Sequence, residues 1–405
     1  MNTSIAYLGI DAGKSFHVAC VKNSAKRSFI PSLTFTDDQK GYDQLRHCLD
    51  SLKDKHGITL FAAGIESTGT YHVKVVEYLR TYSDIHLTVL NPLQTSHYLK
   101  SDLRRAATDK VSAEVIALFM AEKTPAPTTF LPEEYETIKH LVHHLHSLSK
   151  QKTASINRLR EHLALVWPEF ERTYHDYNTK QILALLTLVQ TPDKIAAFDF
   201  VAHKKITSSG SVYTLRADFI EAVKDLAAHS QRRFSRSATE PIIKSLAEEI
   251  LFLLHQIDQI TESMREIFAR HSVTGHPPLL ATIQGVGEEA AMVVTAHIGD
   301  PQRFSSVKQV VACFGMNPGV KESGTSIHGK RHLQKKGNAL VRYYLFNCVL
   351  TMIRYPEHPI AKFYHRLCEQ GKPKMVAMIA CMKKLLIIMF TMLRSNTPFS
   401  MSYAS

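Results

Sequence analysis

Three acidic residues in the first part of the chain could together hold a metal ion. Asp11 follows the apolar run 5–10, Glu66 follows the apolar run 60–65, and Asp109 opens a helical stretch. Carboxylates at strand ends on one edge of a sheet can converge on a point, and their oxygens are the ligands that Mg²⁺ prefers. Mg²⁺ beside a phosphodiester supports phosphoryl transfer. The alternative is that each residue is an ordinary helix cap or turn residue.

A serine near the C-terminus is the candidate nucleophile. Ser323 stands beside a glycine in a basic loop expected at 321–337. Nearby cations would stabilise the charge that builds on phosphoryl oxygens when a hydroxyl attacks phosphorus. The alternative is a loop that only grips the nucleic-acid backbone. The residues expected to contact nucleic acid are Lys321, His328, Lys330, Arg331, Lys335, Lys336 and Arg342.

A glycine-rich turn is expected between two helical segments at 283–287, where the sequence reads I-Q-G-V-G. Gly285 and Gly287 would leave backbone N–H groups free at a helix N-terminus, which suits a phosphate. This pattern is typical of a helix-hairpin-helix element that contacts nucleic acid. A simple glycine turn is the alternative.

Positive charge is concentrated at one end of the chain. Residues 301–405 carry 16 Lys and Arg against 3 Asp and Glu, whereas residues 1–300 are nearly neutral, with 33 against 34. Such asymmetry indicates a module that meets a polyanion, and nucleic acid is the first candidate. The alternative is a soluble protein that happens to be basic.

The elements that must position these residues fall into three predicted domains. Short apolar strands alternate with helical segments over residues 1–128, which predicts an α/β domain. Three prolines at 125–132 mark a boundary. Residues 129–275 are predicted to be helical, with a polar loop at 207–213, and 276–405 form a basic helical domain.

The second long helix of the middle domain carries a regular apolar seam. Its apolar residues step by three and four without a break, which indicates about three heptads of coiled coil. The seam needs a partner helix, either the earlier helix of this chain or one from another subunit. Its members are Ile243, Leu246, Ile250, Leu253, Ile257, Ile260, Met264 and Ile267.

The sequence favours a cytoplasmic protein. Six cysteines without a C-x-x-C pair indicate reduced thiols. No signal peptide is recognised at the N-terminus. The apolar stretch 385–392 is too short to span a membrane, so a buried C-terminal helix and no membrane partner are expected.

The motifs taken in order resemble a known family. They read Y-L-G-I-D, I-E-S-T-G-T-Y, T-D-K-V-x-A, G-V-G, R-F, F-G-x-x-P, E-S-G-x-S, K-x-G-N and R-x-x-L. This combination resembles the DEDD transposases of the IS110 insertion-sequence family, whose relatives include the Piv-type DNA invertases. The resemblance covers about residues 5–128 and 276–400.

The resemblance implies both a fold and a mechanism. The fold would be an RNase H-like (RuvC-like) N-terminal domain, a coiled-coil linker and a helical transposase domain. The activity would be site-specific recombination of donor and target DNA, guided by a non-coding bridge RNA and carried out by a dimer to tetramer. By motif position, Asp11, Glu66 and Asp109 match acidic residues that act with Mg²⁺ or Mn²⁺. Ser323 matches a serine that forms a covalent phosphoserine link to DNA.

One position departs from the family pattern. The fourth acidic residue falls three positions after the third, and here that position is Ser112. Three residues along a helix keep the same face, so Ser112 should still point at the metal site. Glu114 lies about 140° around the helix and is a poor substitute. A hydroxyl binds Mg²⁺ more weakly than a carboxylate, so one metal position should be weakened.

Two rival functions remain open on the sequence. A metal-dependent nuclease of the RuvC class would cut DNA by water attack and would not need Ser323. A decayed transposase would bind nucleic acid without chemistry, and Ser112 is the feature that hints at it. Recombination guided by RNA would leave the choice of DNA site outside the protein.

Overall fold

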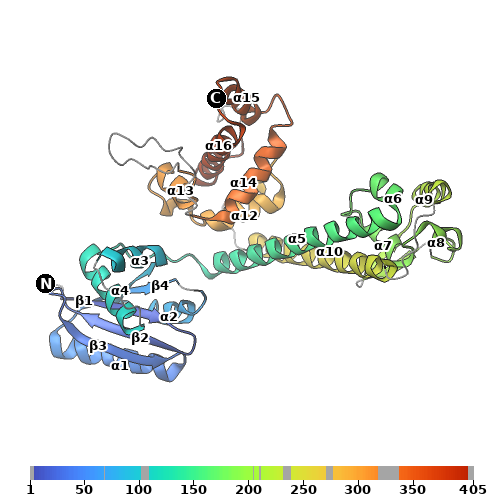
Figure 1. Cartoon of the computed structure of the whole chain (residues 1–405). Coiled ribbons are helices and arrows are strands. Elements are labelled where there is room, and N and C mark those ends of the chain that lie inside the picture. Colours follow the sequence, from blue (N-terminus) through green and yellow to red (C-terminus); the bar gives the residue numbers. More distant parts are fainter. Residues whose placement is uncertain are drawn as a thin grey trace. The chain divides into compact units, whose positions relative to one another are not determined.

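The computed structural model describes residues 4–67, 69–101, 109–203, 205–208, 211–230, 239–270, 277–317 and 337–399. The chain divides into two compact units, Met1–Phe130 and Leu131–Ser405, and each is considered by itself (Figure 1). The first unit ends close to the predicted end of the N-terminal domain. The division of the remainder into a coiled-coil domain and a transposase domain stays a prediction.

The first unit is a mixed α/β domain built on a five-stranded sheet. The strand order is β3-β2-β1-β4-β5, in which the pairs β1–β2 and β2–β3 are antiparallel and the pairs β1–β4 and β4–β5 are parallel. This confirms the predicted α/β class. Its elements are β1 (Ile5–Ala12), β2 (Phe16–Lys22), β3 (Ser28–Thr36), α1 (Gln39–His56), β4 (Leu60–Glu66), α2 (His72–Leu79), β5 (Ile85–Leu90), α3 (Pro92–Ser101) and α4 (Asp109–Lys123).

The two faces of the sheet are covered by different helices, because successive side chains of a strand point to opposite faces. Leu8 and Ile10 of β1 belong to the main core of the unit, together with apolar residues of α1 and α2. On the other face, Val18 and Cys20 of β2 pack against Ala113 of α4. Helix α4 therefore covers the face opposite α1.

The two residues that flank α1, Asp38 and Gly57, explain where the helix begins and ends. The side chain of Asp38 accepts a hydrogen bond from the backbone N–H of Gly41, which caps the first turn. Gly57 ends the helix in the left-handed conformation with φ 63°, and its N–H bonds to the carbonyl of Lys53. These two caps set the bounds of α1 at Gln39 and His56.

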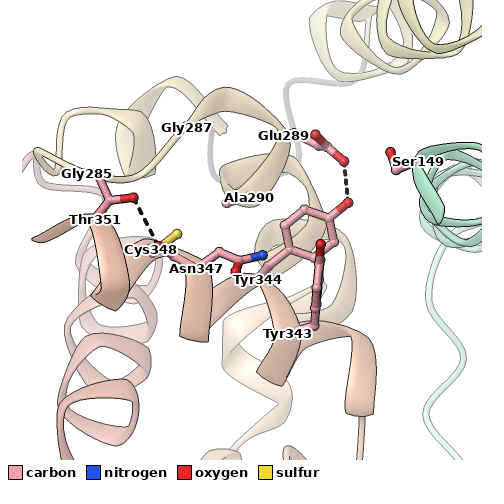
Figure 2. A pocket seen from close by; sticks show the side chains of 10 residues that line it. All are labelled: Ser149, Gly285, Gly287, Glu289, Ala290, Tyr343, Tyr344, Asn347, Cys348 and Thr351. Atoms are coloured by element: carbon pink, nitrogen blue, oxygen red, sulfur yellow. Dashed lines mark hydrogen bonds between the residues drawn. The ribbon is translucent and has the colours of Figure 1, made fainter. Parts of the chain in front are cut away.

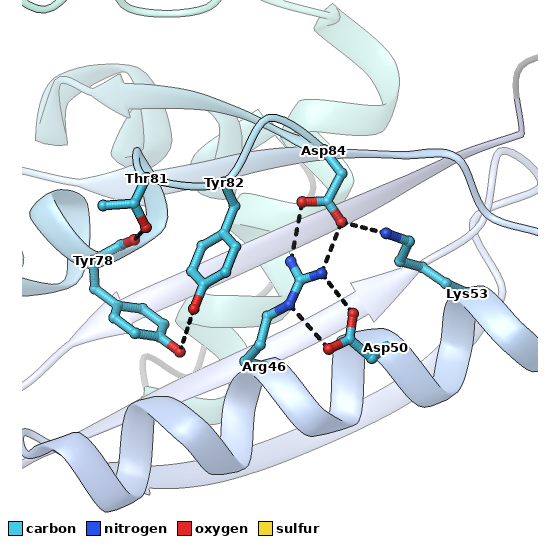
Figure 3. A network of polar contacts seen from close by, with 7 residues as sticks. All are labelled: Arg46, Asp50, Lys53, Tyr78, Thr81, Tyr82 and Asp84. Carbon is cyan, nitrogen blue, oxygen red and sulfur yellow. Dashed lines mark hydrogen bonds and ion pairs between the residues drawn. The ribbon is translucent and has the colours of Figure 1, made fainter.

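A network of charges ties α1 to the loop before β5 (Figure 3). Arg46 donates two hydrogen bonds to Asp84, at 3.0 and 3.1 Å, and Lys53 donates a third at 2.6 Å. Burial opposes ionisation of Asp84, but these hydrogen bonds outweigh it and hold the pKa of Asp84 at about 2. The Arg46 guanidinium also lies 4.4 Å from the ring centroid of Tyr82. The network fixes α1 against the sheet.

The second unit is mostly helical. It begins with the longest helix of the described chain. Its buried apolar residues form two separate cores, one mainly in its last helices and one between residues 156 and 254. Its elements are α5 (Glu133–Val166), α6 (Pro168–Thr173), α7 (Lys180–Leu188), α8 (Pro192–Ala196), β6 (Lys205–Ser208), β7 (Ser211–Thr214), α9 (Ala217–His229), α10 (Thr239–Arg270), α11 (Pro277–Ala281), α12 (Glu288–Ile298), the 3-10 helix η1 (Pro301–Arg303), α13 (Val307–Cys313), α14 (Ala339–Met352), α15 (Pro359–Glu369) and α16 (Lys374–Ser395).

The predicted seam of α10 packs against α5 of the same chain (Figure 1). Ile243 and Ile250 share a core with the C-terminal half of α5, whereas Met264 shares a core with Ile138 and Val142 near its N-terminus. The two helices are therefore antiparallel. Of the two partners that the sequence left open for the seam, the structure contains the earlier helix of the same chain.

Two other expectations about this unit have clear outcomes. The predicted polar loop at 207–213 was wrong, because the strands β6 and β7 pair as an antiparallel hairpin there. The buried C-terminal helix is confirmed: α16 is long and apolar enough to cross a membrane, yet 61% of its most apolar window is buried inside the unit. Leu385, Leu386 and Met389 of this helix are fully buried.

Candidate active site

Asp11 and Glu66 are neighbours at the carboxyl ends of two adjacent parallel strands. The register pairs Ile10 of β1 with Ile65 of β4, so the next residue of each strand carries a carboxylate. Ile10 and Ile65 point into the main core, and the alternation of a strand therefore turns both carboxylates to the opposite face, which α4 covers. Both side chains are half-buried. The sheet brings these two predicted site residues together.

A buried threonine holds the carboxylate of Glu66. Thr95 of α3 donates a hydrogen bond from its hydroxyl to Oε2 of Glu66 at 2.7 Å. The same hydroxyl lies 3.0 Å from the carbonyl oxygen of Pro92. Helix α3 follows β5, which pairs with β4 next to Glu66. Thr95 was missed in the sequence, because its neighbours Q-T-S carry no motif that distinguishes a site residue from an ordinary helix residue.

Helix α4 begins at the same edge of the sheet. Ala113, near its start, approaches Gly9 of β1, whereas Phe119 and Met120, near its end, share a cluster with Tyr7. The helix therefore runs antiparallel to β1, and its first turn lies at the end of β1 that carries Asp11. Asp109 is the first residue of α4, and its side chain lies outside the described part of the chain. Ser112 is half-buried, one residue before Ala113.

Glu114 is engaged elsewhere. Its Oε1 atom accepts a hydrogen bond from Nζ of Lys22 at 3.0 Å, and Lys22 is 4% exposed. Lys22 lies in β2, at the end of that strand remote from Asp11. The contact agrees with the expectation that Glu114 faces away from the other carboxylates and does not replace the missing fourth acid.

The donor atoms at this edge suit a hard divalent cation. The carboxylates of Asp11 and Glu66 are oxygen ligands, and the hydroxyl of Ser112 is a third oxygen on the helix that starts there. No cluster of three or more histidine, cysteine or carboxylate side chains that could hold a metal ion occurs within the described residues. Two carboxylates and one hydroxyl are thus the oxygen groups described at this edge, and their role as metal ligands stays a prediction.

The predicted nucleophile Ser323 lies outside the described residues, as do Lys321, His328, Lys330, Arg331, Lys335 and Lys336. The residues that flank this segment are described and close together. A Cβ atom on Gly337 would lie 2.5 Å from the backbone nitrogen of Gly315, and Gly337 has a φ of +94°. Only glycine fits both the left-handed backbone and the close approach. Gly337 therefore lies directly against the backbone of residues 313–315.

Two polar side chains reinforce this junction. The side-chain oxygen Oδ1 of Asn338 accepts hydrogen bonds from the backbone N–H groups of Leu340 and Val341, which caps α14. Arg342 donates from Nη1 to the carbonyl oxygen of Phe314 at 3.0 Å. The contact shows that Arg342 helps to hold the two ends together, while its predicted contact with nucleic acid stays a prediction.

The glycine turn at 283–287 precedes a helix, α12, as predicted, but two negatively charged residues follow it directly. Gly285 has a φ of +92°, and a Cβ atom there would lie 2.7 Å from Cγ of Met352. Gly287 directly precedes α12, whose first two residues are Glu288 and Glu289. The N-terminus of the helix stabilises these negative charges, and they would repel a phosphate placed there. The sequence G-V-G-E-E already contained this signal.

Comparisons with known proteins agree at both ends of the chain. Residues 8–168 match the family of DEDD transposases of IS110 elements, and residues 278–365 match the transposase family of IS116, IS110 and IS902. The chain is 27% identical to a pilin gene-inverting protein of Moraxella bovis, over 98% of both chains. It is 22% identical to an uncharacterised 44.8 kDa protein of insertion element IS116 from Streptomyces clavuligerus, over 97% of this chain and 96% of that protein.

Proposed function

The chain belongs to the IS110 family of transposases, and from this premise we propose that it joins DNA strands at specific sites through a phosphoserine at Ser323, with a divalent metal at its acidic cluster. It is an enzyme of DNA strand transfer, as its family is. The phosphoserine mechanism, the guide RNA and the oligomeric state are our proposal.

One observation carries the proposal. Asp11 and Glu66 lie side by side at the ends of β1 and β4, on the face where α4 begins with Asp109. The strand order β3-β2-β1-β4-β5 also supports the RNase H-like fold that the sequence motifs implied. Carboxylates in this position would hold Mg²⁺ or Mn²⁺, with Ser112 in place of a fourth acid. When bound, the metal would withdraw charge from a phosphoryl oxygen.

The serine supplies the covalent step. The Oγ atom of Ser323 attacks a phosphorus atom of the DNA backbone, loses its proton, and forms the phosphoserine bond. The bond from phosphorus to one sugar oxygen breaks, and that oxygen takes up a proton. A sugar hydroxyl of the other DNA partner then attacks the phosphoserine and releases the serine. The number of phosphodiester bonds is conserved, so no hydrolysis and no external energy source are needed.

The partners follow from the same proposal. Donor and target DNA would be selected by pairing with a structured non-coding RNA, the bridge RNA, and the protein would act as a dimer to tetramer. The excess positive charge of residues 301–405 supports contact with such polyanions. One relative is named for inversion of a pilin gene and another for an insertion element. Strand exchange of this kind would account both for inversion of a gene and for movement of an insertion element.

The test is a strand-exchange assay with element DNA, target DNA and the non-coding RNA transcribed beside the reading frame. Wild-type protein should give joined products and a protein–DNA adduct that survives denaturant. Ser323→Ala should lose both by several orders of magnitude in rate, because the covalent nucleophile is gone. Thr325→Ala, which removes a hydroxyl at the variable position of the motif E-S-G-x-S, is the matched control and should retain both. Adduct formation by Ser323→Ala at the wild-type level would overturn the proposal.

The rival functions give different products in the same assay. A RuvC-like nuclease would release free DNA ends without an adduct and would be indifferent to Ser323→Ala. A decayed transposase would bind DNA and RNA but yield neither ends nor joined strands. Joined products that form equally well without the RNA would contradict the guided mechanism alone and leave the serine chemistry standing.

A further inference from the structure

Two adjoining pockets form a groove between α5 and α14 in the second unit. One pocket has a volume of about 280 Å³, and the other of about 470 Å³. Both are lined by Ser149 of α5 and Tyr343 of α14, so they are continuous. Figure 2 shows the first pocket, with Ser149 on one side and the two tyrosines of α14 on the other. We call this feature the α5–α14 groove.

The wall of the groove formed by α5 is a polar stripe. His146, Lys150, Thr153 and Asn157 recur at intervals of three and four residues, which places them on one face of the helix. The apolar residues that pack on α10 lie on a different face of α5. Thr153 and Asn157 are exposed, and so is Lys150, which contributes a positive charge. This stripe is therefore free to meet a ligand.

The opposite wall presents an aromatic ring. Tyr343 is 48% exposed, and its ring centroid lies 4.9 Å from that of His146 and 5.4 Å from that of Tyr344. Those two neighbours hold one side of the ring and leave the remainder open to the groove. The Nδ1 atom of His146 is buried and finds no hydrogen-bond partner among the described residues. An exposed aromatic ring beside a cation and an amide is the combination that binds unstacked bases.

We propose that the α5–α14 groove binds an unpaired stretch of nucleic acid, with a base stacked on Tyr343 and the adjacent backbone phosphate at Lys150 and Lys152. This inference rests on the proposed function, since it assigns part of the polyanion contact to a defined surface. Burial, with Lys150 close by, lowers the pKa of His146. At neutral pH the His146 ring is therefore uncharged, so the positive charge of this wall comes from the lysines.

The two ends of the groove differ in charge. Both lysines line the larger pocket, whereas Glu289 of α12 lines the smaller one and accepts a hydrogen bond from the hydroxyl of Tyr344. A phosphate would be repelled at the Glu289 end and attracted at the Lys150 end. The backbone of the bound strand should therefore run along α5, and the base should enter between Ser149 and Tyr343. A duplex cannot present a base face in this way, which selects for unpaired nucleotides.

The test uses the full-length protein and short single-stranded DNA and RNA that carry 5-iodouracil, which crosslinks on illumination to an aromatic ring stacked on it. The crosslinked peptide should contain Tyr343. Tyr343→Ala should remove the crosslink and weaken binding of the strand about tenfold, whereas Tyr343→Phe should keep both, because stacking needs the ring and not the hydroxyl. The double variant Lys150→Gln, Lys152→Gln should weaken binding and flatten its salt dependence.

Matched controls separate this surface from general effects. Tyr355, which is 46% exposed and lines neither pocket, should tolerate Tyr355→Ala without loss of binding. Lys244 of α10 is an exposed lysine outside the groove, and Lys244→Gln should change little. Unchanged melting temperatures would show that the variants are folded. A crosslink with RNA alone assigns the groove to the RNA, and one with DNA alone assigns it to a DNA strand.

Two results would overturn the inference, and they are distinguishable. If wild-type protein binds nucleic acid but Tyr343→Ala binds equally well and the crosslink maps outside α5 and α14, the groove assignment fails and the proposed function stands. If wild-type protein binds neither DNA nor RNA, the proposed function fails together with the inference.

Discussion

Gly9 of β1 and Ala113 of α4 are in backbone contact: a Cβ atom on Gly9 would lie 2.2 Å from the carbonyl oxygen of Ala113. The same atom would lie 2.3 Å from the backbone nitrogen of Ala117. At this position no side chain fits between the strand and the helix. The contact sits two residues before Asp11 and four residues after Asp109, so it fixes the distance between the strand and the helix that carry two of the proposed metal ligands.

Gly9→Ala is therefore expected to separate α4 from β1. The added methyl group collides with backbone atoms, which cannot rotate away, so the free energy of unfolding should fall by at least about 1–3 kcal/mol. Strand-exchange activity should fall further than stability alone explains, because the acidic residues move apart. Chemical denaturation and the exchange assay measure the two effects. Gly287→Ala is the control for stability, since a Cβ atom there meets nothing within 4 Å.

Much of this site was predictable because its residues stand at element ends. Asp11 and Glu66 each follow a short apolar run, and the register pairs the two runs from Ile5 with Leu60 to Ile10 with Ile65. The register that makes them neighbours depends on sheet pairing between segments about 55 residues apart in sequence. The contact of Glu66 with Thr95 joins two residues 29 apart. No local pattern encodes such pairing, so the sequence predicted the acidic pair but not its support.

The second unit shows where sequence patterns stop being informative. The seam of α10 was visible because eight apolar residues keep helical spacing, but the pattern is equally compatible with a partner from another chain. The hairpin β6–β7 was missed because its strands of four residues are polar and too short for alternation to be recognised. Arg342 stays a predicted nucleic-acid contact, and its hydrogen bond to Phe314 was not predictable because it joins residues 28 apart in sequence.

Ser112→Asp tests the departure from the family's acidic pattern. The side chain is half-buried in the first turns of α4, where charges attract a divalent cation more strongly than in bulk water. Restoring a carboxylate should therefore lower the concentration of Mg²⁺ or Mn²⁺ that half-maximal exchange requires. A metal titration of wild type and variant side by side measures this. If the variant requires equal or more metal, the site has adapted to three carboxylates and the added charge only repels its neighbours.

Ile250→Asp should unfold the helix pair. Ile250 is fully buried between α10 and α5, and an unpaired charge there costs at least about 3 kcal/mol. Phe252→Asp is the matched control on the same helix, because Phe252 is 52% exposed and should tolerate the charge. Limited proteolysis and thermal melting should separate the two variants. Equal stability of both would mean that the seam does not pack within one chain as described.

Stability should fall in mild acid through His297. Burial lowers the pKa of His297 to about 4, below the ordinary value of 6.5, so the unfolded chain binds a proton more readily than the folded one. The stabilising contribution is complete above pH 6.5 and is lost as the pH falls through 4. Its full size is about 3 kcal/mol. His297→Gln should make denaturation midpoints less dependent on pH over this window, and an unchanged slope would contradict the assignment.

Cleavage of the polypeptide by bound iron tests whether a metal ion binds at the ends of β1 and β4. Fe²⁺ replaces Mg²⁺ at oxygen sites, and with ascorbate and peroxide it produces radicals that cut the polypeptide close to the ion. We expect cuts near residues 11 and 66 and at the start of α4, suppressed by excess Mg²⁺ and lost in Asp11→Asn and Glu66→Gln. Cuts that map elsewhere, or that persist at wild-type intensity in both variants, would contradict it.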